Sequence, residues 1–175
     1  MFNIVFETPN VKHIPALSEA LRDCGQDDSL NFYGLGEHRV SVFDWMDWRI
    51  KEMRAQQAYT LSILNNEAIF LGEVSLRYMQ ASNAELSYWV RHSQRSKKIG
   101  GWAAEKICQI AFDQLQINSI FLSANLNNVN SINIAKALGA EEVIYYDNPR
   151  DIDLFSWEEN KIFKLNNEKF RVARK

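Results

Sequence analysis

Short runs of β-branched and aromatic residues, separated by polar turns, predict the strands of this chain. Residues 2–6 form the first apolar run, which ends at Thr8-Pro9-Asn10. Residues 59–64 and 69–78 predict two strands joined by a turn at Asn65-Asn66-Glu67, so a β-hairpin is expected there. Further strands are predicted at residues 85–90, 119–125 and 142–147, with residues 161–165 as a candidate for one more.

Apolar positions with helical spacing alternate with these strands. Residues 13–24 carry apolar side chains along one helical face. Ser41 and Asp44 have the spacing of a capping box, and they begin a predicted helix that runs to about residue 57. Two more helices are predicted at residues 100–115 and 131–138, the second followed by Gly139.

This order of elements predicts an α/β (α+β) fold. We expect a central mixed, mostly antiparallel sheet of six to seven strands, flanked by helices on both faces. The chain has 175 residues and no linker, repeat or low-complexity segment. Residues 1–175 are therefore predicted to form one domain.

Composition and charge exclude several classes of protein. A formal net charge of −2 disfavours binding to nucleic acid, which usually requires a basic surface. The N-terminus lacks the pattern of a signal peptide, and no apolar run approaches the ~18 residues that cross a bilayer, so a soluble, cytoplasmic protein without a membrane partner is expected. Cys24 and Cys108 are expected to be buried, reduced thiols, and the spacing of the three histidines predicts no metal site.

A basic loop between a predicted strand and a predicted helix is the most informative stretch. It carries the four basic side chains of Arg91, Arg95, Lys97 and Lys98, and then passes directly into the helix at Gly100. Free N–H groups at a helix start attract anions, so a phosphate group is expected to bind there. The alternative is a basic loop that only contacts solvent.

The loop sequence resembles a known family. Arg95-Ser96-Lys97-Lys98-Ile99-Gly100 is similar to the Q/R-x-x-G-x-G/A loop with which the GNAT superfamily binds the pyrophosphate of CoA. A second segment, Asn128-Val129-Asn130-Ser131 followed by Ala135-Lys136-Ala137-Leu138-Gly139-Ala140, is similar to that family's N-x-x-S…A-x-x-L-G-F pattern. Trp45, Leu71-Gly72-Glu73-Val74 and residues 84–90 resemble the RimJ/RimL branch, with Ser87 where glycine is usual.

The resemblance implies a GNAT-type fold and acetyl-CoA as cosubstrate, without a metal. The residues that it places on the cofactor are Trp89, Val90, Arg95, Ser96, Lys97, Lys98, Ile99, Gly100, Gly101, Asn128 and Ser131. Lys98 departs from the family pattern, because it stands where glycine permits close backbone approach and unusual dihedral angles.

The resemblance also implies candidates for catalysis. Glu85 would take a proton from the attacking ammonium, directly or through water; the alternative is an edge glutamate that only contacts water. Ser131 would protonate the leaving thiolate, or would only cap a helix. Tyr145 and Tyr146 are a second candidate acid, although tyrosines in strands more often serve packing.

The acceptor site is predicted around a loop at residues 31–39 and the helix that follows. By resemblance, Phe32, Trp48 and Glu37 would bind a cationic amine, and the alternative places these aromatic residues in the core. The function implied is direct transfer of an acetyl group to a primary amine, of a protein N-terminus or a small molecule, in a ternary complex. The alternative is a non-catalytic acyl-CoA-binding or regulatory module, and a monomer and a homodimer are both open.

Overall fold

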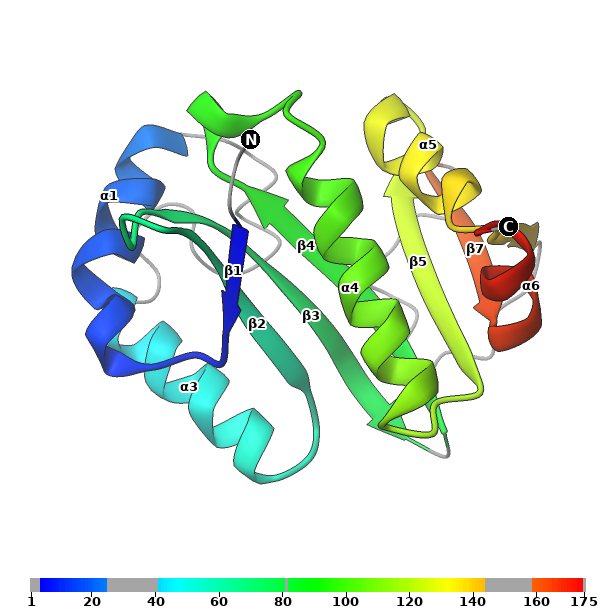
Figure 1. The fold of residues 1–175 in the computed structure, drawn as a ribbon, viewed down its shortest axis with the longest axis horizontal. Helices are drawn as coiled ribbons and strands as arrows, with labels where there is room; N and C mark the ends of the chain where they lie inside the picture. The colour runs from blue at the N-terminus through cyan, green and yellow to red at the C-terminus, as the bar shows by residue number, and fades with distance from the viewer. Residues whose placement is uncertain (1–3, 25–40, 81, 144–158, 175) are drawn as a thin grey trace. The chain divides into compact units, whose positions relative to one another are not determined.

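The computed structural model describes residues 4–24, 41–80, 82–143 and 159–174. Figure 1 shows the strands and helices that these residues form. The strands are β1 (Ile4–Glu7), β2 (Tyr59–Asn65), β3 (Phe70–Gln80), β4 (Asn83–Val90), β5 (Ser119–Asn125), β6 (Glu141–Val143) and β7 (Asn160–Asn166). The helices are η1 (Val11–His13), α1 (Ile14–Cys24), α3 (Val42–Arg54), η2 (His92–Gln94), α4 (Ile99–Asp113), α5 (Val129–Ala137) and α6 (Asn167–Val172).

The strands form one seven-stranded sheet in the order β1-β2-β3-β4-β5-β7-β6. β1 pairs antiparallel with β2, and β7 pairs antiparallel with both β5 and β6. β4 and β5 are parallel, with Glu85 opposite Phe121. The predicted fold class is confirmed: a mixed, mostly antiparallel sheet with flanking helices.

The chain divides into two compact units. Unit 1 comprises residues 1–75 and 88–103, and unit 2 comprises residues 76–87 and 104–175. The core of unit 1 joins buried side chains of α1 and α3 to the sheet, among them Leu17, Trp45, Phe70 and Trp89. In unit 2, α4 buries Ile107 and other small apolar side chains completely. That the whole chain acts as one domain stays a prediction.

The capping box predicted at the start of α3 is confirmed. Ser41 is the N-cap residue, and its Oγ accepts a hydrogen bond of 3.0 Å from the backbone N–H of Asp44. The Ser41 hydroxyl in turn donates to Asp44 Oδ2 at 2.6 Å. These two bonds fix the start of α3, because they satisfy a donor that the helix leaves without an intrahelical acceptor.

α3 carries a fully buried arginine, which sequence patterns did not predict. Arg49 is 0% exposed and lies with its guanidinium carbon 3.9 Å from the centroid of the Trp45 ring. Its Nη1 donates to Glu52 Oε2 at 3.0 Å, and its Nε lies 3.1 Å from Glu73 Oε1 on β3. Burial of an unpaired charge is costly, so the buried Arg49 guanidinium requires its carboxylate partners. Because one of them lies on β3, the ion pair links α3 to β3.

Most predicted elements are confirmed within a few residues, and the strand at residues 119–125 has the predicted bounds. The candidate strand at residues 161–165 is β7, which lies between β5 and β6. Sequence patterns missed η2 and α6, since each is too short to show a period. The predicted loop at residues 31–39 and the end of the strand at 142–147 lie outside the described residues.

Both cysteines are free and buried, which confirms that part of the prediction. In the parts of the chain that the structure describes, no helix has the length and apolar character needed to cross a membrane.

Gly72 in β3 allows unusually close backbone packing. A Cβ atom at this position would lie 2.2 Å from the backbone carbonyl oxygen of Trp89 on β4. Nearby, the Arg91 N–H donates to the Leu71 carbonyl oxygen at 2.8 Å, so the end of β4 cannot move away without losing this bond.

We therefore predict that Gly72→Ala destabilises the protein. Overpacking costs about 1 to 3 kcal/mol, which corresponds to a fall in Tm of roughly 2 to 12 °C for a chain of this size. Thermal unfolding followed by circular dichroism measures the effect. Asn66→Ala, at an exposed position of the β2–β3 turn, is the control. Equal melting temperatures for Gly72→Ala and the wild type would contradict the close packing.

Candidate functional site

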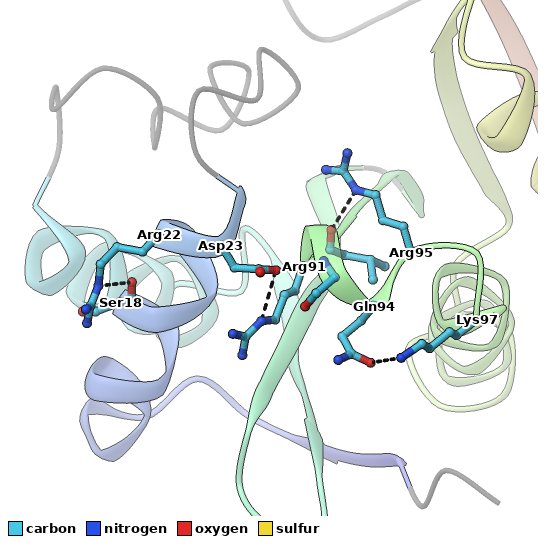
Figure 2. Close-up of polar contacts among 9 residues, drawn as sticks. Ser18, Arg22, Asp23, Arg91, Gln94, Arg95 and Lys97 are labelled. Atoms are coloured by element: carbon cyan, nitrogen blue, oxygen red, sulfur yellow. Dashed lines mark hydrogen bonds and ion pairs between the residues drawn. The ribbon is translucent and has the colours of Figure 1, made fainter.

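The basic loop joins β4 to α4 in unit 1 and has a defined hydrogen-bond pattern (Figure 2). β4 ends at Val90, and the one-turn helix η2 follows at once. The backbone N–H of Gln94 donates to the Arg91 carbonyl at 3.0 Å, and that of Arg95 donates to the His92 carbonyl at 3.1 Å. The segment before residue 96 is thus an ordered turn.

Ser96 and Lys98 both adopt left-handed backbone conformations. Their φ angles are +64° and +63°. This region favours glycine, because a Cβ atom there crowds the following carbonyl oxygen. Lys98, which stands where the similar loop pattern has glycine, thus adopts a conformation that favours glycine although it carries a side chain. Ser96 shares this feature, which the sequence analysis did not single out.

The loop leads directly into the first turn of α4. The N–H of Trp102 donates to the Lys98 carbonyl at 3.1 Å, which is the first hydrogen bond of the helix. The N–H groups of Ile99, Gly100 and Gly101 precede it and have no acceptor within the helix, by the geometry of any α-helix. Ile99 is 2% exposed and anchors the turn in the core, while the two glycines add no side chain over these donors. An anion is the natural partner for such a turn.

The four basic side chains of the loop have different partners (Figure 2). Arg91 Nε lies 3.2 Å from Asp23 Oδ2 of α1, so its charge is paired within the protein. Arg95 Nε donates to the Val90 carbonyl at 3.2 Å, and Lys97 Nζ donates to Gln94 Oε1 at 2.9 Å. Both side chains are exposed, as is that of Lys98. Arg95, Lys97 and Lys98 thus remain the cationic candidates for an anion.

Trp89, predicted on the cofactor, is a core residue by its side chain. It is 4% exposed and stacks on Phe70 with ring centroids 5.8 Å apart. Val90 is half-buried, and its carbonyl oxygen accepts the bond from Arg95. Because the Trp89 side chain is buried, any contact of Trp89 with a cofactor would come from its backbone.

Glu85 lies in unit 2 on β4, a strand that has neighbours on both sides in the sheet. It is 6% exposed, so the alternative of an edge glutamate in water is wrong. Ser87, two residues further along the same strand face, is 8% exposed, and its Oγ has no hydrogen-bond partner among the described residues. Glu85 is thus a largely buried carboxyl group beside a buried hydroxyl group.

Asn128 and Ser131 lie together at the start of α5, also in unit 2. Asn128 is the N-cap residue, and its Oδ1 accepts a hydrogen bond of 3.1 Å from the Ser131 N–H. The cap expected of Ser131 is therefore provided by Asn128. The Ser131 hydroxyl does not cap the helix and is half-buried.

The acceptor residues are described only in part. Phe32 and Glu37 lie outside the described residues, as do Tyr145 and Tyr146. Trp48 is 41% exposed and meets Trp45 edge to face, with ring centroids 5.5 Å apart. Trp48 is thus anchored to the core along one edge but is not a core residue.

Two other groups are excluded from acid–base or nucleophilic roles by their surroundings. Burial raises the pKa of the Cys108 thiol to about 12, so it is protonated near pH 7 and is not a nucleophile. Glu73 is 2% exposed and is held in the ion pair with Arg49, which does not suit a base that must exchange protons with a substrate.

Asp23 also contacts the loop, and it was not predicted from the sequence. The signal was present, since Asp23 lies in the last turn of α1, where the helix dipole disfavours a carboxylate. Its pKa is lowered chiefly by the hydrogen bond from the backbone N–H of Ser93, with a further contribution from Arg91.

Comparison with known proteins identifies relatives of this fold. Residues 3–141 match the family model of the acetyltransferase (GNAT) domain. Comparison with curated protein sequences gives no match.

Solved structures with the same fold are similar over almost the whole chain. Spermidine N-acetyltransferase from Vibrio cholerae, in complex with CoA and spermine, has a TM-score of 0.74 at 12% identity, covering 97% of this chain and 98% of that chain. RimL, a ribosomal L7/L12 α-N-protein acetyltransferase in complex with CoA, has a TM-score of 0.73 at 12% identity and 94% coverage of both chains. Microcin C7 self-immunity acetyltransferase MccE, with acetyl-CoA and AMP, has a TM-score of 0.72 at 16% identity, with coverage of 94% and 92%.

The left-handed conformation of Lys98 generates a prediction about stability. A residue with a Cβ atom is destabilised by about 1 to 2 kcal/mol in this conformation, and glycine would remove that strain. Glycine also raises the conformational entropy of the unfolded chain, which offsets part of the stabilisation. Lys98→Gly should therefore raise the free energy of unfolding by up to about 1 kcal/mol, or Tm by roughly 2 to 4 °C.

Lys97→Gly is the matched control, because Lys97 is not among the residues with positive φ. It should lower Tm slightly, since glycine there only adds flexibility to the unfolded chain. Differential scanning calorimetry measures both variants. A loss of stability in Lys98→Gly as large as that in Lys97→Gly would contradict the strain.

Proposed function

Because the chain belongs to the GNAT acetyltransferase family, we propose that it transfers an acetyl group from acetyl-CoA to a primary amine by direct attack in a ternary complex. The observation that carries this proposal is the loop in which Ser96 and Lys98 keep glycine-like backbone conformations immediately before α4. This loop places exposed cations beside the N-terminus of a helix, which is the chemistry that a pyrophosphate group requires. We also propose that residues 1–175 act as one catalytic domain, as a monomer or a homodimer.

The cosubstrate is assigned to the loop and to the start of α5. Arg95, Lys97 and Lys98 supply positive charge to the pyrophosphate, and the N–H groups of residues 99–101 supply neutral donors. On α5, Asn128 keeps an amide nitrogen that can donate to a pantetheine carbonyl, because only its Oδ1 is used in the cap. CoA and acetyl-CoA in the similar structures are consistent with this assignment.

Glu85 is proposed as the general base. An amine is protonated near neutral pH, and it must lose a proton before its nitrogen can attack the thioester carbonyl carbon. A buried carboxylate can accept this proton directly or through a water molecule. The amine then forms the new C–N bond as the C–S bond breaks, without a covalent enzyme intermediate.

Ser131 is proposed as the acid that meets the leaving group. Its hydroxyl, in the first turn of α5, can donate a proton to the thiolate as the sulfur departs. The nitrogen that has attacked the carbonyl still carries one proton too many, and loss of that proton, directly or through water, restores the Ser131 hydroxyl. Binding both reactants side by side would supply much of the rate enhancement. Glu85 and Ser131 would accept and donate the protons.

The acceptor is proposed to be a cationic amine with an apolar or planar portion. Trp48 offers a partly exposed aromatic face, which attracts cations and flat groups. Phe32 and Glu37 are assigned to the same role from sequence alone. A protein N-terminus or an amine-bearing sugar nucleotide meets this description better than a small bare polyamine.

A non-catalytic acyl-CoA-binding module is the second candidate, since fold alone does not establish activity. Backbone strain at Lys98, where the family pattern has glycine, is the observation that favours it. Thiol release from acetyl-CoA, measured with a panel of amines, separates the two functions. Binding of CoA without any turnover would favour the module.

The cofactor assignment predicts a thermal shift. Acetyl-CoA at about 100 times its Kd should stabilise the fold by roughly 2.7 kcal/mol and raise Tm by about 5 to 10 °C. Arg95→Ala should weaken binding about tenfold or more, because a charge-assisted bond to phosphate is lost. Arg54→Ala, an exposed arginine at the end of α3, is the control. No shift in the wild type at millimolar CoA would contradict the assignment.

The catalytic assignment predicts a separate effect. Glu85→Gln should lower kcat by about 10² or more, since general-base catalysis contributes 10² to 10⁴, and should leave the Kd for CoA unchanged. The acidic limb of the pH–rate profile should also disappear. Glu73→Gln serves as the comparison, and it should affect stability through Arg49 rather than the pH profile. If Glu85→Gln retains the wild-type rate at every pH, the base lies elsewhere.

A further inference from the structure

The start of the basic loop is held by a residue from a different part of the chain. Asp23 Oδ2 accepts a hydrogen bond of 2.9 Å from the backbone N–H of Ser93, 70 positions away in the sequence. The same oxygen lies 3.2 Å from Arg91 Nε. Figure 2 shows the Asp23 carboxylate directed at Arg91 from the end of α1.

This carboxylate does the work of a helix cap. The N-cap residue of η2 is Arg91, whose side chain makes no capping hydrogen bond. The N–H of the second residue in a helix is the donor that a capping oxygen commonly accepts. Ser93 is that residue in η2, and Asp23 supplies the oxygen that Arg91 lacks.

The residue preferences of helix C-termini do not explain why an acid, Asp23, stands near the end of α1. The position is the penultimate residue of the helix, where partial negative charge of the carbonyl groups repels a carboxylate. The unfavourable placement is offset by the contact with η2 and Arg91, and the pKa of Asp23 is correspondingly lowered. Residues that break a local rule in this way are expected near functional sites.

The turn that Asp23 caps sets the positions of the cationic side chains. η2 contains Gln94, which accepts the hydrogen bond from Lys97, and its final N–H bond is made by Arg95. Ser96 and Lys98 then follow in strained conformations, which persist only when the surroundings hold them.

We infer that Asp23 is a positioning residue for acetyl-CoA: its carboxylate fixes η2, and thereby the loop that binds the pyrophosphate group, without touching the cofactor. The inference rests on the proposed function. It identifies a residue of α1 that supports the loop whose sequence motif covers residues 95–100.

The test compares the Kd for CoA, measured by isothermal titration calorimetry, in four proteins. Asp23→Ala should bind CoA about two- to thirty-fold more weakly than the wild type, as expected for loss of a cap. Asp23→Asn should lose less, because its amide oxygen can still accept the Ser93 N–H. Glu19→Ala, which removes an exposed acid of α1 four residues earlier, should bind CoA as the wild type does.

A second measurement separates positioning from general loss of structure. Amide hydrogen exchange should speed up at residues 91–98 of Asp23→Ala and stay unchanged in β2 and in the core of unit 1. Equal CoA affinity in Asp23→Ala and the wild type would overturn the inference and leave the proposed function standing. Faster exchange throughout unit 1, or an equal loss in Glu19→Ala, would also overturn it. No CoA binding by the wild type would instead contradict the proposed function.

Discussion

Backbone N–H groups that enter a helix need acceptors, and this need organises the segment between β4 and α4. The Arg91 N–H is taken by the Leu71 carbonyl of β3, and the Ser93 N–H by Asp23 of α1. The first intrahelical hydrogen bond of α4 is donated by the N–H of Trp102. The N–H groups of Arg91 and Ser93 at the start of the loop thus have acceptors on β3 and α1. The N–H groups in the first turn of α4 come after this loop in the chain. Such a turn is available to an external anion without further rearrangement.

The contacts on either side of the loop offset the backbone strain within it. Two residues with side chains hold left-handed conformations at Ser96 and Lys98, each at a cost of about 1 to 2 kcal/mol. The anchor of Ile99 in the core and the cap from Asp23 lie on either side of them. A loop fixed at both ends can keep an unfavourable backbone conformation that a free loop would lose. A lysine at position 98 is therefore expected to lower the stability of the loop relative to glycine.

The sequence predicted the strands and longer helices because their hydrophobic period, the capping box at Ser41 and the turn at residue 65 are local signals. The position of β7 between β5 and β6 was not predictable in this way, because strand order depends on contacts between distant segments. For the same reason the loop motif indicated Arg95 and Lys98 but not Asp23, whose contact spans 70 positions. The buried Arg49 was missed because a charged residue in a helix is usually exposed.

The proposed chemistry depends on which buried polar groups are already used by the structure. Glu73 is paired with Arg49, so its protonation would remove one of the two carboxylates that neutralise this buried guanidinium. The Cys108 thiol is held in its neutral form by burial, which removes the obvious route to a covalent acyl-enzyme. Direct attack of the amine requires only a proton acceptor and a donor to the leaving sulfur. The proposal assigns these roles to Glu85, which is buried on a central strand, and to Ser131, which lies in the first turn of a helix capped by Asn128.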